Sequence, residues 1–306
     1  MNKAIYIATN EETSGKSIVT LGLMSMLIGK TAKVGYFRPI VEDFEDGELD
    51  NHIDTVINHF GLDIDFNDAY AIKKSKLIKK KNRGKLGEVI DLIIEKYKKI
   101  EEQFDFVLVE GTSFIGEGTA IEMDTNVLIA KNLGIPAIII GSGIGKSLDE
   151  LVDSLCLAYH SFKLKDVEVL AVIANKVQVE NLELVKLGLK KNLPEGVLVN
   201  AIPLISSLKN ITVQEVVKEL DAKVLFGEAY LNNQISSFSV GAMQLRNYLM
   251  HLKQDGLVIT PGDRADIILG ALQANESKNY PSISGIVLTG NIIPEDTILK
   301  LIEGLS

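Results

Sequence analysis

Residues 4–17, AIYIATNEETSGKS, decide the fold of this 306-residue chain. Residues 4–8 are a short apolar run, which predicts a buried β-strand. A polar loop follows and ends in Gly15-Lys16-Ser17, where a stretch with helical patterning begins. This order is the context of a phosphate-binding loop, in which backbone N–H groups and the positive end of a helix face an anion. We therefore predict a P-loop type of α/β domain, with Gly15, Lys16 and Ser17 as candidate nucleotide- or phosphate-binding residues.

The loop departs from the standard P-loop pattern at its start. Asn10 stands where the pattern has its first glycine, and Glu11 and Glu12 add two carboxylates to a cradle for anions. Two interpretations stay open: a loop that binds a Mg-nucleotide, with the Ser17 hydroxyl on Mg²⁺, and an inherited fold that no longer binds nucleotide. A P-loop lysine points at its ligand rather than into the core, so we expect Lys16→Ala to leave folding intact.

Further along the chain, short apolar runs alternate with amphipathic stretches. The alternation predicts a parallel α/β sheet, whose ligands bind at the carboxyl ends of the strands. The glycine-rich loop at 141–147 is one residue shorter than a P-loop and predicts a tight turn, with Ser147 and Glu150 as a capping box. Strands are expected at residues 4–8, 34–37, 106–109, 137–140, 169–173 and 197–202, and helices at 17–29, 84–104, 121–133, 147–162 and 181–192.

From about residue 205 the alternation restarts, which predicts a second, smaller α/β unit. The expected domains are residues 1–205 and 206–306. The sequence ends on a helix, and we expect the natural chain to continue beyond it. In this second unit, helices are expected at residues 211–220, 242–252, 263–274 and 295–304, and strands at 223–226, 237–240, 257–260 and 286–288.

Composition and charge exclude several classes of protein. The chain has 32 Lys and Arg against 41 Asp and Glu, a net charge of −9, which makes it a poor general binder of nucleic acid, because phosphate contacts need a basic face. Its basic run at residues 73–85 is interpreted as a solvated connector. The single Cys156 forms neither an internal disulfide nor a zinc site of cysteines. No apolar run approaches the ~20 residues of a membrane span. We expect a cytoplasmic protein that binds neither nucleic acid nor membrane.

Several short motifs in the first domain resemble those of the dethiobiotin-synthetase-like P-loop proteins. They are Gly15-Lys16-Ser17, Gly35-Tyr36-Phe37-Arg38-Pro39, Asp105-Phe106-Val107-Leu108-Val109-Glu110-Gly111, Asn126 and Ala130 ahead of Ile135-Pro136-Ala137, Asn175-Lys176 and Ile202-Pro203. The resemblance covers about residues 1–205.

The second domain resembles the DRTGG domain. The matching motifs are Val240-Gly241-Ala242-Met243, Ile259-Thr260-Pro261-Gly262-Asp263-Arg264-Ala265-Asp266 and Leu288-Thr289-Gly290. The two domains in this order are similar to the N-terminal half of long-form phosphate acetyltransferases, which make acetyl phosphate and CoA from acetyl-CoA and phosphate. In that family the half is regarded as regulatory and assembly-supporting. The resemblance covers no acetyltransferase domain, and stand-alone proteins of the same two domains would match as well.

The first resemblance implies roles for individual residues. Glu11 falls where dethiobiotin synthetases keep an acidic, metal-associated residue. Glu110 implies a metal or substrate contact, and with Ser17 these two residues are the candidate Mg²⁺ ligands. Asn175 matches an asparagine that contacts adenine. Arg38 replaces a lysine beside the diamine substrate, and because arginine stays protonated it argues against dethiobiotin synthesis.

The DRTGG-type loops leave two interpretations open. Asp263, Arg264, Thr289 and Gly290 are candidates for a ligand-binding loop or an interface at the carboxyl ends of two strands. In the structural interpretation Asp263 caps a helix, and Arg264 pairs with Asp266 or with a neighbouring subunit.

Three functions follow for the whole chain. The first is a regulatory and oligomerising region of a phosphate acetyltransferase, without chemistry of its own. The second is a stand-alone ATP-dependent enzyme, and the third is a sensor of a nucleotide or another metabolite. A homo-oligomer and a small-molecule effector are the expected partners, and Mg-nucleotide is the one cofactor considered.

Overall fold

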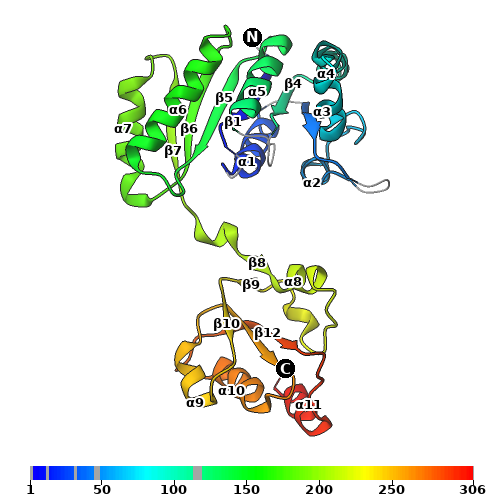
Figure 1. Cartoon of the computed structure of the whole chain (residues 1–306), viewed down its shortest axis with the longest axis vertical. Coiled ribbons are helices and arrows are strands. Elements are labelled where there is room, and N and C mark those ends of the chain that lie inside the picture. Colours follow the sequence, from blue (N-terminus) through cyan, green and yellow to red (C-terminus); the bar gives the residue numbers. More distant parts are fainter. Residues whose placement is uncertain (1–2, 12–13, 31–32, 45–48, 113–118, 306) are drawn as a thin grey trace. The chain divides into compact units, whose positions relative to one another are not determined.

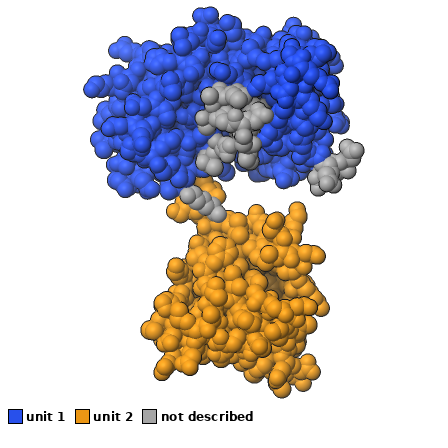
Figure 2. Space-filling view, viewed as in Figure 1, with its two compact units in different colours: residues 1–204 blue, residues 205–306 orange. Residues whose placement is uncertain are grey.

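The computed structural model describes residues 3–11, 14–30, 33–44, 49–112 and 119–305. Contacts within the chain cluster into two compact units, Met1–Leu204 and Ile205–Ser306 (Figure 2). Each unit has its own hydrophobic core. None of the described helices is long and apolar enough to cross a membrane.

The first unit is built on a seven-stranded parallel sheet in the order β3-β2-β4-β1-β5-β6-β7 (Figure 1). The central strand β1 pairs with β4 on one side and with β5 on the other, so the loop that leaves β1 opens at the middle of the sheet. The strands are β1 Ala4–Thr9, β2 Val34–Val41, β3 Tyr70–Lys73, β4 Phe106–Glu110, β5 Ala137–Ser142, β6 Val169–Val177 and β7 Leu198–Pro203.

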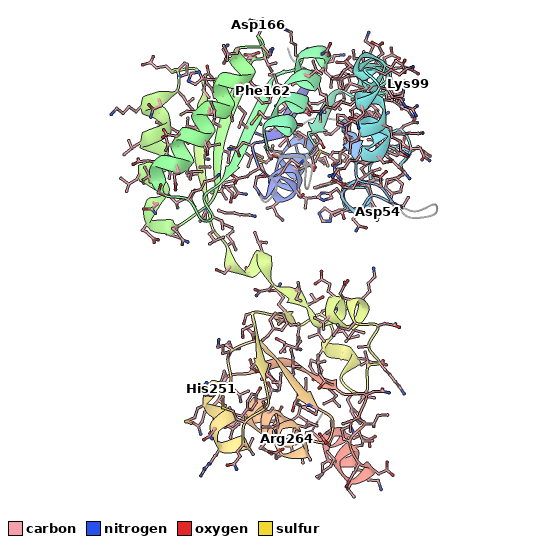
Figure 3. All side chains as sticks on the ribbon, viewed as in Figure 1. Asp54, Lys99, Phe162, Asp166, His251 and Arg264 are labelled. Atoms are coloured by element: carbon pink, nitrogen blue, oxygen red, sulfur yellow. The ribbon has the colours of Figure 1, made fainter. Side chains whose placement is uncertain are left out.

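Helices cover both faces of this sheet. One core joins the sheet to α4, α5, α6 and α7, with Phe162 of α6 fully buried in it (Figure 3). The other core joins the opposite face to α1 and α2. The helices are α1 Lys16–Ile28, α2 Asn51–Phe60, α3 Lys74–Asn82, α4 Leu86–Glu101, α5 Thr119–Leu133, α6 Leu148–Lys163, η1 Val179–Asn181 and α7 Leu182–Asn192. The expected P-loop type of α/β fold is confirmed.

Strand β2 runs further than its apolar pattern predicts, because a proline is tolerated inside it. Pairing with β4 ends at Phe37↔Val109, whereas pairing with β3 continues through Arg38↔Tyr70 to residue 41. Successive N–H groups of a strand point to opposite sides, and the Arg38 N–H donates toward β3, to the Ala69 carbonyl. The N–H that Pro39 lacks would point to the side that β4 has already left. The extension carries Arg38 to the carboxyl edge of the sheet.

The second unit has a three-stranded parallel sheet in the order β10-β11-β12 and a two-stranded ladder of β8 and β9. Its core lies between α9, α10 and the sheet. The elements are η2 Ser206–Lys209, β8 Ile211–Thr212, α8 Val213–Glu219, η3 Glu228–Tyr230, β9 Gln234–Ile235, β10 Ser237–Val240, α9 Leu245–Tyr248, η4 Leu249–His251, β11 Gly256–Pro261, α10 Ala265–Glu276, β12 Ile283–Thr289 and α11 Asp296–Glu303.

Two expectations for the second unit are corrected. The strand expected at 223–226 is absent: these described residues pair in none of the sheets, and the chain has just turned at Asp221, which has a φ of +46°. The helix expected at 242–252 is shorter, because residues 242–244 are non-helical and the last turn is the 3₁₀ helix η4. The strand expected at 237–240 is present with those bounds, and the other strands and helices expected in this unit are present with shifted ends.

Candidate functional site

The phosphate loop joins β1 to α1 and is braced from behind by β6. Gly15 adopts the left-handed conformation (φ +78°), and an added Cβ would lie 2.5 Å from Asn175 Nδ2. Asn175 donates from Nδ2 to the Ser14 carbonyl (2.7 Å) and accepts from the Lys176 N–H (2.9 Å). Asn175 is the residue expected to contact adenine. Its Nδ2 holds the phosphate loop, and its Oδ1 is hydrogen bonded within β6.

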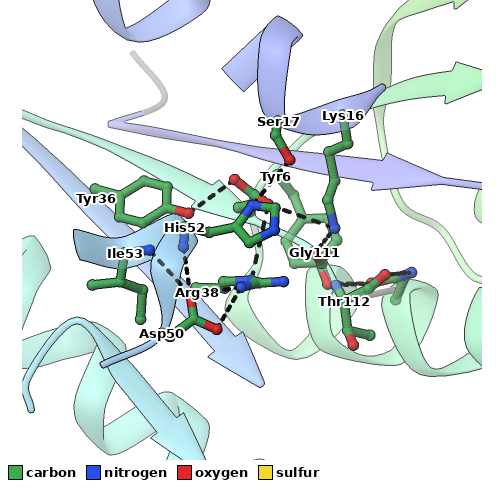
Figure 4. Close-up of polar contacts among 12 residues, drawn as sticks. Tyr6, Lys16, Ser17, Tyr36, Arg38, Asp50, His52, Ile53, Gly111 and Thr112 are labelled. Atoms are coloured by element: carbon green, nitrogen blue, oxygen red, sulfur yellow. Dashed lines mark hydrogen bonds and ion pairs between the residues drawn. The ribbon is translucent and has the colours of Figure 1, made fainter. Parts of the chain in front are cut away.

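Lys16 lies in the interior of the first unit, with only 5% of its side chain exposed. Its Nζ donates to the Gly111 carbonyl and lies 3.7 Å from Glu110 Oε1, both at the end of β4 (Figure 4). The Gly111 carbonyl is held in place by Asn126 of α5, which exchanges hydrogen bonds with both backbone groups of Thr112. In this structure the cation of the loop is thus directed at the end of the neighbouring strand.

The buried position of Lys16 changes the expectation for Lys16→Ala: the substitution should destabilise the fold rather than leave it intact. The substitution would remove a buried countercharge of Glu110 and a charged donor to Gly111, so we expect a loss of about 1.5–3 kcal/mol in the free energy of unfolding. Urea unfolding followed by circular dichroism would measure it, since the chain has no tryptophan. An unchanged unfolding midpoint would restore the original expectation.

Glu110 is the centre of a buried cluster of charges, and its side chain is 1% exposed. Its Oε2 accepts a hydrogen bond from the Tyr36 hydroxyl (2.8 Å). Its Oε1 lies 3.7 Å from Lys16 Nζ, 3.8 Å from His52 Nδ1 and 3.9 Å from Arg38 Nε. No hydrogen-bond partner of Oε1 lies within the described residues. One carboxylate oxygen is thus hydrogen bonded, and the other is held by charge.

Arg38 joins the cluster to the start of α2. Its Nη1 contacts both carboxylate oxygens of Asp50 at 2.7 Å. Asp50 is also the N-cap of α2, and its Oδ1 accepts from the N–H groups of His52 and Ile53. The residue that begins α2 is therefore tied to β2, which sets the position of His52 over the loop.

Ser17 and His52 meet across the mouth of the loop. Ser17 Oγ is hydrogen bonded to His52 Nδ1 at 2.9 Å. The same nitrogen lies 3.8 Å from Glu110, so the hydroxyl and the carboxylate converge on one histidine atom. Both oxygens are of the kind that Mg²⁺ prefers. Two of the three candidate Mg²⁺ ligands are therefore brought together.

The third candidate, Glu11, has other partners. Both of its carboxylate oxygens lie 2.8 Å from Lys146 Nζ, and Oε1 accepts from the Ser142 N–H (2.6 Å). Glu11 thereby ties the phosphate loop to the turn between β5 and α6. That turn ends in the expected capping box, in which Ser147 and Glu150 bond reciprocally. Glu12 lies outside the described residues.

The pKa values of the cluster follow from burial and from its balanced charges. Burial alone would raise the pKa of Glu110, but the charges of Lys16 and Arg38 outweigh it and leave that pKa below its ordinary value. Burial, aided by the Arg38 charge, lowers the pKa of His52. Burial and the neighbouring Glu110 raise the pKa of the Tyr36 phenol well above its usual range. At neutral pH the cluster therefore holds an ionised Glu110 and a neutral His52.

These shifts predict that stability falls as the solution is acidified. The unfolded chain takes up a proton on His52 near pH 6.5, whereas the folded protein resists it, so stability declines from about that pH downward. The lowered pKa of Glu110 adds a second loss, as pH falls through its folded-state value. We expect His52→Ala to flatten the decline between about pH 6.5 and 5 in a series of urea titrations. Parallel curves for the two proteins would contradict this assignment.

In the second unit the candidate loops meet at the carboxyl ends of the sheet. Pro261 pairs with Thr289 in the register of β11 and β12, which brings Asp263 and Arg264 to the same edge as Gly290. Arg264 pairs with Asp266 through two contacts of 2.8 and 2.9 Å. It also donates to the Met243 carbonyl after β10 (2.7 Å). The expected pairing of Arg264 with Asp266 is confirmed.

The expectation that Asp263 caps the following helix is wrong. The helix α10 begins at Ala265, so its N-cap is Arg264, and no side chain caps it. Asp263 stands one residue too early and is exposed. The N–H groups of Ile267 and Ile268 instead bond the Arg264 carbonyl.

Asp50 and His52 are site residues that the sequence patterns did not predict. Their helix is short, but it carried a signal: Asp50 at its start and Gly61, which is left-handed (φ +59°), at its end. Nothing in the local sequence indicated that this helix packs against the phosphate loop, because that contact depends on the pairing of Asp50 with Arg38.

The parallel sheet, with a Gly-Lys-Ser loop after its central strand, defines this molecule as a P-loop type α/β protein with a second α/β unit. Residues 3–222 match the AAA domain family AAA_26, which is dethiobiotin-synthetase-like, and residues 215–306 match the DRTGG domain. The chain belongs to this AAA domain family, and its second unit is a DRTGG domain. The resemblance drawn from the sequence is confirmed.

The chain aligns with the N-terminal region of phosphate acetyltransferases. It is 37% identical over 307 residues to the phosphate acetyltransferase of Synechocystis sp., an alignment that covers 100% of this chain and 44% of the relative. It is 39% identical over 308 residues to that of Nitratidesulfovibrio vulgaris, covering 99% of this chain and again 44% of the relative. The chain thus spans less than half the length of these relatives.

Solved structures resemble the first unit more distantly. An apo-form GTPase from Pyrococcus abyssi superimposes with a TM-score of 0.38 and 14% identity, covering 65% of this chain and 90% of that one. A nucleotide-binding protein in complex with ADP from Archaeoglobus fulgidus has a TM-score of 0.38 and 16% identity, covering 68% and 84%.

Proposed function

We propose that this chain is the regulatory and oligomerising N-terminal region of a phosphate acetyltransferase, which converts acetyl-CoA and phosphate into acetyl phosphate and CoA. The observation that carries the proposal is the self-paired phosphate loop. Lys16 is directed at Glu110 and Gly111, and Arg38 at Asp50, so two buried cations are balanced by two buried carboxylates. A loop whose cation is already paired within the chain supports the reversible binding of an effector better than it supports catalysis.

The other reactive groups of the chain agree with a role without chemistry of its own. Burial raises the pKa of the Cys156 thiol, with the Asp153 charge adding to it, so little of this cysteine is thiolate at neutral pH. The transferase reaction is assigned to the remainder of such an enzyme. We further propose that the complete protein is a cytoplasmic homo-oligomer with a small-molecule effector.

A second candidate function is Mg-nucleotide binding, in an enzyme or a sensor, and it is favoured by one observation. Ser17 Oγ lies 2.9 Å and Glu110 Oε1 lies 3.8 Å from the same nitrogen of His52, so two oxygens of the kind that Mg²⁺ prefers lie near one point. Ser17 and Glu110 would hold Mg²⁺, and Lys16 would meet phosphate after leaving Glu110. Bound Mg²⁺ would supply positive charge to the phosphates. Glu11 does not fit this set, because Lys146 already binds its carboxylate.

The mass of the native polypeptide tests the proposal first. An antibody against this chain should recognise in source cells a band well above 33.5 kDa, and the captured protein should form acetyl phosphate from acetyl-CoA and phosphate. A version of that protein without residues 1–306 should keep the reaction but lose its native oligomeric mass and its response to metabolites. A band at 33.5 kDa without acetyl transfer would reject the proposal and favour the nucleotide-binding candidate.

A further inference from the structure

We propose that Glu110 is a tethered counter-anion that closes the phosphate loop, so that a phosphate-class oxyanion binds this chain only by displacing Glu110 from Lys16. The inference rests on the regulatory role proposed above and names the contact through which an anionic effector would act. Glu110 and the oxyanion would compete for Lys16, and this competition would decide when the loop can bind a ligand.

The Glu110 carboxylate is held unevenly, which makes one side of it easy to release. Oε2 has a short hydrogen bond from the Tyr36 hydroxyl (2.8 Å), which anchors the group. Oε1 faces Lys16 Nζ at 3.7 Å, beyond hydrogen-bond distance, and no hydrogen-bond partner of Oε1 lies among the described residues. A phosphate oxygen at hydrogen-bond distance from Nζ would interact more strongly than this carboxylate oxygen does.

A second cation is placed to take over Glu110 when Lys16 leaves. Arg38 Nε lies 3.9 Å from Oε1 and is itself a buried donor without a hydrogen-bond partner in the described part of the chain. The two atoms without partners are neighbours, so a small shift of Oε1 toward Arg38 would form a charged hydrogen bond. Displacement would therefore not leave a buried carboxylate without a cation, the situation that makes breaking a buried ion pair expensive.

The start of α1, where Lys16 would then contact the oxyanion, already has the features of an anion-binding position. The first N–H groups of α1 lack side-chain caps, and the thirteen-residue helix directs its positive end at the same place. Gly15 is left-handed, and the loop is braced by Asn175. The described residues from Gly15 to Ser17 are therefore already arranged to meet an anion, and Lys16 would exchange its contact with Glu110 for one with the ligand.

Titration with inorganic phosphate and, separately, with Mg·ATP tests the proposal on the whole chain. Glu110→Gln keeps the shape of the side chain and an oxygen for Tyr36 but removes the charge that competes for Lys16. We expect it to bind one of the two probes at least about tenfold more tightly than the unsubstituted chain, as measured by calorimetry. The probe that responds identifies the source of the oxyanion, free phosphate or a nucleotide.

Glu11→Gln is the matched control, because it makes the same change of charge on the phosphate loop itself, at a carboxylate bound to Lys146. We expect its affinity to stay within about threefold of the unsubstituted chain. Equal affinities for the Glu110 and Glu11 variants would overturn the proposal, and so would binding of neither probe by any of the three proteins.

A measurement on the unsubstituted chain decides the matter if Glu110→Gln fails to fold. The titration curve of the ¹³C carboxyl signal of Glu110 should move when inorganic phosphate or Mg·ATP is saturating, because Arg38 then replaces Lys16 as the nearest cation. A titration curve that does not move would overturn the proposal. Neither result depends on the acetyl-transfer assay or on the native mass. The proposal for Glu110 can therefore be rejected while the proposed regulatory role stands, and the regulatory role can be rejected while the proposal for Glu110 stands.

Discussion

We expect Arg38→Ala to lower the free energy of unfolding by about 3–5 kcal/mol, the range for breaking a buried ion pair by removing one partner. Arg38 is 4% exposed and is the only cation that contacts Asp50 within the described residues. Without it Asp50 stays buried as the N-cap of α2, and Glu110 loses one of its two neighbouring permanent charges. Urea unfolding followed by circular dichroism measures the loss.

The control for Arg38→Ala removes a cation from an ion pair that lies at the surface. Lys99 pairs with Glu95 one turn away on the exposed side of α4 (Figure 3). Such pairs contribute about 0.3–0.5 kcal/mol, so Lys99→Ala should change stability by no more than that. A loss below about 1 kcal/mol for Arg38→Ala would mean that water or a shifted side chain compensates Asp50, and the buried cluster would not be a determinant of stability.

We expect Gly262→Ala to destabilise the second unit by about 3 kcal/mol, near the upper end for an overpacked core. An ideal Cβ on Gly262 would overlap the backbone carbonyl of Ile292, which follows β12. A backbone carbonyl cannot turn away as a flexible side chain can, so β11 and the segment after β12 would have to separate. Hydrogen exchange should show faster exchange confined to β11, β12 and α10.

Gly22→Ala is the control for Gly262, with the opposite expected sign. Gly22 lies inside α1, is exposed, and has nothing within 4 Å of an added Cβ. Alanine at such a position should stabilise the helix by about 0.5–1 kcal/mol. Unchanged exchange in the second unit of Gly262→Ala would show that the chain accommodates a methyl group there, and the close approach would not be what requires glycine.

The parallel sheet could be predicted from the sequence because its strands are buried on both faces. Residues 106–109 and 137–140 are continuous apolar runs, and such runs are strands of a covered parallel sheet. The short β3 does not fit this pattern, since Ile72 is the one buried residue of the four in Tyr70–Lys73 and the strand ends in a lysine. The run at 223–226 also predicts a strand, but a strand requires pairing with a neighbour, and these residues pair in none of the sheets of the described chain.

The basic run at residues 73–85 shows that a local pattern of charged residues does not reveal their partners either. Its charges predict a solvated connector, whereas most of the run forms the helix α3. Its lysines have local acidic partners: Lys74 lies beside Glu42, and both Lys80 and Lys85 contact Glu88. The carboxylates that neutralise these lysines lie up to 32 positions away in the chain, so the sequence of the run alone does not predict these ion pairs.

The sequence by itself determined the fold class, the position of the phosphate loop and the two-domain order, because these depend on apolar periodicity and on glycine and lysine at fixed local spacing. It also supplied Lys16, Ser17 and Glu110 as candidate site residues. Only the tertiary structure decided what these side chains do. Charges attract across space, and sheet pairing brings Lys16 to Glu110 over 94 positions of chain. A buried charge takes the nearest countercharge available, and that partner is set by topology, which no local stretch of sequence contains.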